Sequence, residues 1–171
     1  MDPRLRSTLT LLVLGGLLAS ATLWGWRAAT KPVPGLSEVE ACVDTDLAAG
    51  TELFPDQVAV SVFNAGQRNG LATKTMNKLI SRGFVGVDTG NAPEGTAVAG
   101  VQIYGRATSP AVQLVQAQFR DAQVTVGPAL GLGVVVVVGD DFKSLLSAKR
   151  APTSLLVAEA STICSPPGSG S

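Results

Sequence analysis

Two neighbouring periodic stretches predict a strand followed by a helix. In residues 58–63, valines alternate with other side chains at the two-residue period of a buried β-strand. In residues 71–80, apolar positions recur every three to four residues, the period of an amphipathic helix. The intervening segment 64–70 follows neither period and contains two glycines, so we expect a loop there. Gly83 is well placed to end the helix, because glycine adopts a left-handed conformation at little cost.

The same patterns continue through the middle of the chain. They predict strands at residues 85–88 and 98–104, a helix starting at Ser109-Pro110 and including Phe119, and strands at 124–126 and 133–138. The five valines of the last strand are too few to cross a membrane and are typical of a strand buried on both faces. The order β-α-β-β-α-β-β predicts an α+β fold, a two-layer sandwich.

An uncharged segment, residues 7–26, precedes this domain and contains a long leucine-rich run. About 20 such residues span a bilayer as a helix, and Trp24 and Trp26 would lie near its headgroups. A cleaved signal peptide, cut at Ala19-Ser20-Ala21, is the alternative. Both interpretations place the rest of the chain outside the cytoplasm. We therefore expect a cell-membrane protein with one N-terminal transmembrane helix, a cytoplasmic N-terminus and an extracytoplasmic C-terminal domain.

These patterns define the expected domains. They are a cytoplasmic tail at 1–6, a transmembrane helix at 7–26, an extracytoplasmic linker at 27–56, an α/β domain at 57–150, and a C-terminal tail at 151–171 that is tied down by Cys164.

Composition excludes several functions. Thirteen basic and 13 acidic residues give no net charge, which argues against a nucleic-acid binder. The chain has no histidine, so it lacks the commonest general base and the commonest zinc ligand. Two cysteines are too few for a thiolate metal cage. We expect no metal, no cofactor and no catalytic residue.

The two cysteines, Cys42 and Cys164, both follow the hydrophobic segment. An even pair in an oxidising compartment is more often bridged than free. They flank the predicted domain, and the ends of a domain often lie close together. A disulfide between them is the prediction, and two free thiols are the alternative.

The loop before the first helix is a candidate anion site, with Asn64, Gly66, Arg68 and Gly70 as its residues. Free N–H groups and the helix dipole favour an anion at such a position, and Arg68 adds a positive charge. The spacing is neither a dinucleotide fingerprint nor a P-loop. The alternative is that the glycines only permit a tight turn.

Basic residues also recur along that helix. Lys74, Lys78 and Arg82 are spaced four residues apart and, with Arg68, would form a stripe facing anionic lipids or wall polymers. The alternative is an ordinary solvated helix face.

Asp140 and Asp141 follow the valine strand, where α/β proteins often place functional acids. Without a partner base or metal motif, they are more simply interpreted as ordinary loop charges.

Several blocks, in order, resemble the LytR C-terminal domain family over roughly Val58 to Phe142. They are "VFNAGQRNGLATKTMNKLISRGF", "GNAP" from Gly90, and "VVVVVGDDF" from Val134. Domains of this family often follow the catalytic domain of LytR-CpsA-Psr cell-envelope proteins and also occur alone behind a membrane anchor. No such catalytic domain precedes the blocks here, so the phosphotransferase activity is not carried over.

The resemblance implies a membrane-anchored binding or scaffolding module of the bacterial cell envelope, associated with peptidoglycan or wall-polymer assembly and not an enzyme. Expected partners are the membrane, anionic lipids or wall polymers, and LytR-CpsA-Psr or other envelope proteins. The alternative is an enzyme, or an accessory subunit, in the phosphotransfer of wall glycopolymers from lipid carriers.

Overall fold

The computed structural model describes residues 3–29 and 42–168, with side chains in the first range placed from residue 12 to residue 26. The chain forms two compact units, Met1–Val39 and Glu40–Ser171.

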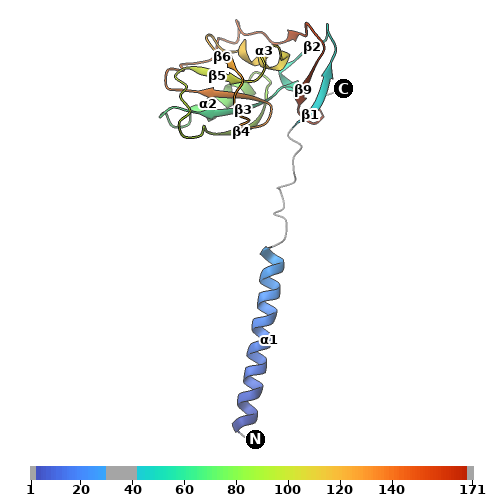
Figure 1. Cartoon of the computed structure of the whole chain (residues 1–171), viewed down its shortest axis with the longest axis vertical. Coiled ribbons are helices and arrows are strands. Elements are labelled where there is room, and N and C mark those ends of the chain that lie inside the picture. The colour runs from blue at the N-terminus through green and yellow to red at the C-terminus, as the bar shows by residue number, and fades with distance from the viewer. Residues whose placement is uncertain (1–2, 30–41, 169–171) are drawn as a thin grey trace. The chain divides into compact units, whose positions relative to one another are not determined.

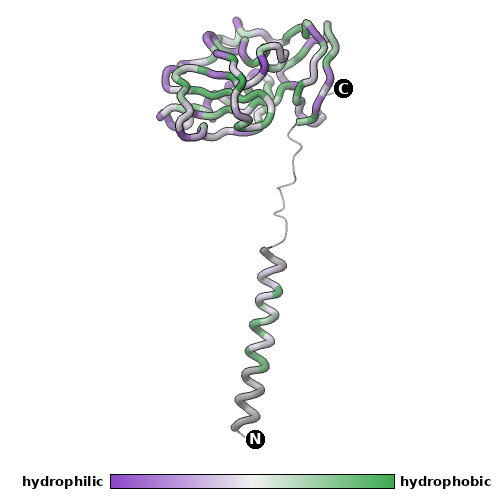
Figure 2. Tube along the Cα trace, in the orientation of Figure 1, coloured by the Kyte–Doolittle hydropathy of each residue, from purple (hydrophilic) through white to green (hydrophobic). Residues whose placement is uncertain are grey.

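The first unit contains one helix, α1 (Pro3–Ala29), which includes all of the predicted span 7–26. Apolar residues occur in the coloured middle part of this helix (Figure 2). Within the described parts of the chain, we find no helix that combines the length and the apolar character needed to cross a membrane.

The second unit is built on a five-stranded sheet (Figure 1). Its strands lie in the spatial order β4-β3-β7-β5-β6. β3 is parallel to both β4 and β7, β5 is antiparallel to β7, and β6 is parallel to β5. The bounds are β3 (Ala59–Asn64), β4 (Val85–Asn91), β5 (Val101–Tyr104), β6 (Gln123–Thr125) and β7 (Val134–Val138).

Helix α2 (Leu71–Ile80) connects β3 to β4, and α3 (Pro110–Gln116) connects β5 to β6. Residues 58–138 therefore show the predicted order β-α-β-β-α-β-β, and the mixed α+β class is confirmed.

The sheet is buried on both faces, which explains the unbroken valine strand. Val134, Val136 and Val138 belong to the main core with apolar residues of both helices. Val135 and Val137 pack with Phe63 on the opposite face, where loop residues cover them. All five valines are therefore buried, and both helices share one layer against one face of the sheet.

Two smaller strand pairs complete the unit. β1 (Val43–Leu47) pairs antiparallel with β9 (Ser161–Ser165), and β2 (Glu52–Leu53) pairs antiparallel with β8 (Leu155–Leu156). A short 3-10 helix, η1 (Pro55–Gln57), leads from β2 towards β3.

Parts of the predicted linker 27–56 and of the predicted tail 151–171 supply strands to the globular unit: β1 and β2 come from the first range, and β8 and β9 from the second. β1 is polar and mostly exposed, and its partner lies more than 100 residues away in the chain. Local periodicity cannot reveal such a pairing.

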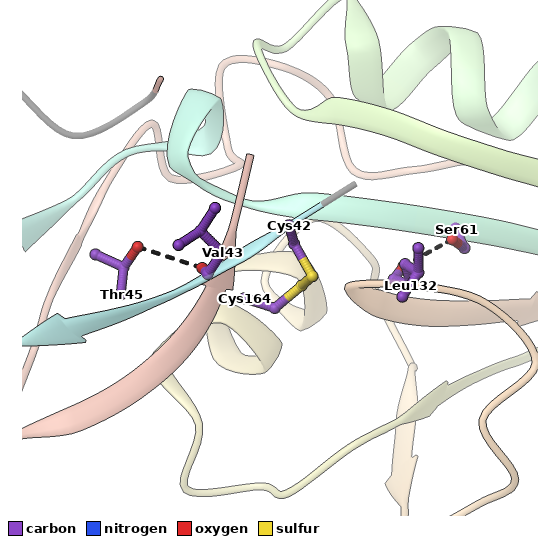
Figure 3. The surroundings of a disulfide bond; sticks show 6 residues. All are labelled: Cys42, Val43, Thr45, Ser61, Leu132 and Cys164. Atoms are coloured by element: carbon purple, nitrogen blue, oxygen red, sulfur yellow. Dashed lines mark hydrogen bonds between the residues drawn. A yellow bond between two sulfur atoms is a disulfide. The ribbon is translucent and has the colours of Figure 1, made fainter. Parts of the chain in front are cut away.

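The predicted disulfide is present between Cys42 and Cys164, with the two Cα atoms 5.2 Å apart (Figure 3). Cys42 lies immediately before β1, and Cys164 lies within β9 opposite Asp44. The covalent bond therefore joins the two chain ends of the globular unit where their strands already pair.

Candidate functional site

Three loops meet at one edge of the sheet. β3, β4 and β7 run parallel, so their carboxyl ends lie at the same edge, where α/β proteins commonly bind ligands. Backbone hydrogen bonds continue past the strands: Ala65 N–H donates to Val138 O at 2.9 Å, and Ala92 N–H donates to Asn64 O at 2.8 Å. The loop that begins at Asn64 and the block that begins at Gly90 are therefore brought side by side.

The first of these loops is closed by the buried Asn64 side chain. Its Nδ2 donates to Arg68 O at 3.0 Å, and its Oδ1 accepts from Gly66 N–H at 3.0 Å. Gly70 then takes a left-handed conformation, with φ of 71°, at the N-cap of α2. The residues predicted as an anion loop thus first serve to fold that loop.

The loop does hold an anion, but the anion is the carboxylate of Asp140. Gln67 N–H donates to both carboxylate oxygens at 2.9 and 3.0 Å, and Arg68 N–H donates to one at 3.3 Å. A Cβ on Gly66 would lie only 2.7 Å from Asp140 Cγ, which explains the glycine there. Asp140 therefore fills the predicted anion position from the loop after β7.

Arg68 fastens the same two loops together. Its guanidinium lies 3.8 Å from Asp140 Oδ1 and donates to Gly139 O at 3.3 Å and to Phe142 O. The side chain remains about half exposed. Arg68 thus positions the segment after β7 against the start of α2.

Arg82 also has a structural role. Its guanidinium donates to the Oε1 atom of Gln118 at 2.9 Å and to Leu146 O. Partial burial lowers the pKa of Arg82 below its usual value. Gln118 is itself buried and bonded to Pro152 O, so these contacts link the end of α2 to the segment that follows α3 and to the C-terminal region.

The predicted basic stripe is therefore divided. Lys74 and Lys78 are exposed on α2 and line a groove of about 180 Å³ together with Arg68 and Lys143. We call this the basic groove. Arg82 does not line it. Sequence reasoning missed Lys143, because it lies in a loop without periodicity and reaches α2 only through the fold.

A second groove, of about 420 Å³, lies at the carboxyl edge between the loop after β3 and the loop after β4. We call it the carboxyl-edge groove. Gln67, Asn69, Asn91, Glu94 and Thr96 contribute amide, carboxylate and hydroxyl groups to its lining. It offers hydrogen-bonding groups and one carboxylate but no pair of nucleophile and base. In the described residues, no group of three His, Cys, Asp or Glu side chains is arranged to hold a metal.

Comparison with known proteins gives one family and one similar structure. The family described as LytR cell envelope-related transcriptional attenuator matches residues 57–142, half of the 171-residue chain. A similar crystal structure is the soluble domain of a conserved hypothetical secreted protein from Mycobacterium marinum, with 23% identity and a TM-score of 0.48 over 64% of this chain and 72% of that chain. No curated protein matches the chain. The chain therefore belongs to the cell-envelope-related LytR C-terminal domain family (LytR_C).

Proposed function

We propose that this protein is a non-enzymatic binding or scaffolding module of the bacterial cell envelope. It works outside the cytoplasm, is held at the membrane by α1, and takes part in peptidoglycan or wall-polymer assembly. Membership of a cell-envelope-related family supports a function in the cell envelope. The Cys42–Cys164 disulfide supports an oxidising compartment, since such bonds are rare in the cytosol.

The proposed anchor is residues 7–26, which carry no charge and lie entirely within α1. In this arrangement the six residues before the segment are cytoplasmic and the globular unit is outside. The length of the uncharged segment and its terminal tryptophans support this arrangement.

The carboxyl-edge groove is the observation that carries the binding role. Parts of two of the blocks that resemble the family line it together: residues 64–66 of the first block and residues 91–93 of "GNAP". Its polar groups suit hydrogen bonding to a hydroxyl- or amide-rich partner such as a glycan or an extended peptide. Binding without turnover is the chemistry that these groups support.

Site-specific crosslinking tests this role. A photoreactive amino acid is placed at exposed Gln67 in the groove, and at exposed Glu159, which does not line it, as the matched control. After irradiation of living cells, we expect the full chain to crosslink to wall material or an envelope protein from position 67 and not from position 159. Equal capture from both positions, or none from position 67, would contradict the proposal.

The enzymatic alternative has its own test. Purified full-length protein is incubated with a polyprenyl-phosphate-linked glycan and an acceptor, and transfer of the glycan is followed. We expect no turnover, and turnover would overturn the non-enzymatic proposal.

A further inference from the structure

The basic groove has a strongly one-sided charge. Four of the eight residues that line it are basic and none is acidic, although the whole chain has equal numbers of basic and acidic residues. Three of the four are lysines: Lys74 and Lys78, one turn apart on α2, and Lys143 from the loop after β7. The fold therefore concentrates positive charge in one place on a neutral protein.

These lysines are not neutralised internally. Within residues 42–168, none of the three ammonium groups lies within ion-pair distance of a carboxylate. The two acids that neighbour the groove in sequence do not line it: Asp140 accepts from the loop after β3, and Asp141 lines the larger neighbouring cavity, together with Asp121. Like charges held together without a counter-ion repel each other. A bound external anion would therefore reduce the electrostatic repulsion among the three ammonium groups.

Arg68 fixes the geometry of the groove. Its bonds to Gly139 O and Phe142 O hold the loop that carries Lys143 against the N-terminal end of α2. The lining also includes two buried apolar side chains, Leu71 and Phe142, which limit how far water surrounds the ammonium groups. Arg68 is therefore a positioning residue, and the three lysines are the groups that an anion would meet.

The groove has space for a small anion. Since a water molecule takes about 30 Å³ in the liquid, a groove of about 180 Å³ admits a small anion with part of its hydration shell. A larger cavity of about 490 Å³ adjoins it, because Phe142 and Lys143 line both. A group attached to the anion therefore has space to extend along the surface.

We propose that the basic groove binds a phosphoryl group through Lys74, Lys78 and Lys143, with the rest of the ligand lying in the adjoining cavity. A phosphoryl group carries up to two negative charges at neutral pH and several strong acceptor oxygens, which match several ammonium donors better than one carboxylate does. This site differs in its charged groups from the carboxyl-edge groove, although Asn69 lines both. Its failure would leave the proposed envelope role standing, and the crosslinking test addresses that role independently.

Calorimetric titration of the full-length protein in a non-ionic detergent tests this proposal, with inorganic pyrophosphate as the probe. The test variant is Lys74→Gln, Lys78→Gln and Lys143→Gln combined. The matched control is Arg106→Gln, Lys149→Gln and Arg150→Gln combined, which removes the same charge from exposed residues that do not line the groove. Thermal unfolding of each variant checks that the fold survives.

We expect the wild type and the control to bind alike and the lysine variant to bind about tenfold more weakly or worse, with affinity falling as salt rises. The absence of wild-type binding would overturn the proposal. So would equal binding by the lysine variant, or equal weakening of both variants.

The source of the phosphoryl group is resolved by a second pair of probes. Soluble short-chain phosphatidylglycerol, compared with phosphatidylcholine of the same chain length, represents a lipid headgroup, and pyrophosphate represents a soluble or polymer-borne phosphate. Tighter lysine-dependent binding of phosphatidylglycerol assigns a lipid, and tighter lysine-dependent binding of pyrophosphate assigns a soluble or polymer-borne phosphate. Lysine-independent binding of both probes would overturn the site.

Discussion

Asp140 shows how far single residues could be interpreted from the sequence. The loop after β3 was expected to favour an anion, and its N–H groups do bind one. The anion is a carboxylate about 70 residues further along the chain, and only the pairing of β3 with β7 brings the two together. The loop motif therefore predicted that an anion binds there, whereas the identity of that anion, the Asp140 carboxylate, depends on the sheet topology.

Removal of the Asp140 carboxylate should destabilise the globular unit. Asp140→Ala removes the acceptor of two exposed backbone N–H groups and breaks a half-exposed ion pair with Arg68, so we expect a loss of about 1 kcal/mol in the free energy of unfolding. Asp141→Ala, at the exposed neighbouring position, should change it by about 0.5 kcal/mol or less. Urea titration of both variants measures the difference, and equal stability of the two would refute the role assigned to Asp140.

The central elements were predictable and the peripheral ones were not. β3 and α2 have clear periodicity and β7 is an unbroken apolar run, because each buries apolar side chains in the core. β1 and β9 are short and largely polar and are stabilised by each other and by the disulfide, so nothing local marks them as strands. By spacing alone, Arg82 belongs to the basic stripe on α2. In the folded chain, however, it donates hydrogen bonds to Gln118 and Leu146 and so connects α2 to other elements.

The disulfide should stabilise β1 and β9 more than the five-stranded sheet. It closes a loop with a sequence separation of 122 residues, for which chain entropy gives a stabilisation of at most roughly 4–5 kcal/mol. In the variant Cys42→Ser with Cys164→Ser, we expect a lower melting temperature and faster amide exchange, first in β1 and β9.

A control within β9 is Ser161→Ala. The buried Ser161 hydroxyl has no hydrogen-bond partner among the described residues, so its removal should not lower stability. A double cysteine variant that melts and exchanges like the wild type would show that the disulfide adds nothing to the unit.

At the scale of the whole molecule, the chain consists of a helix that carries the uncharged segment and a globular unit of the LytR C-terminal family. The globular unit has two grooves of different chemistry, one rich in amides at the carboxyl edge and one rich in lysines beside α2. Both proposed binding roles require that this unit faces the wall side of the membrane.

Labelling of single added cysteines in intact cells tests that location most directly. Glu159→Cys places a thiol on an exposed residue of the globular unit, with the Cys42–Cys164 pair left intact, and Asp2→Cys places one in the N-terminal tail. With a membrane-impermeant maleimide, we expect position 159 to be labelled in intact cells and position 2 to be labelled only after lysis. Protection of position 159 until lysis would contradict an extracytoplasmic domain and, with it, the envelope role.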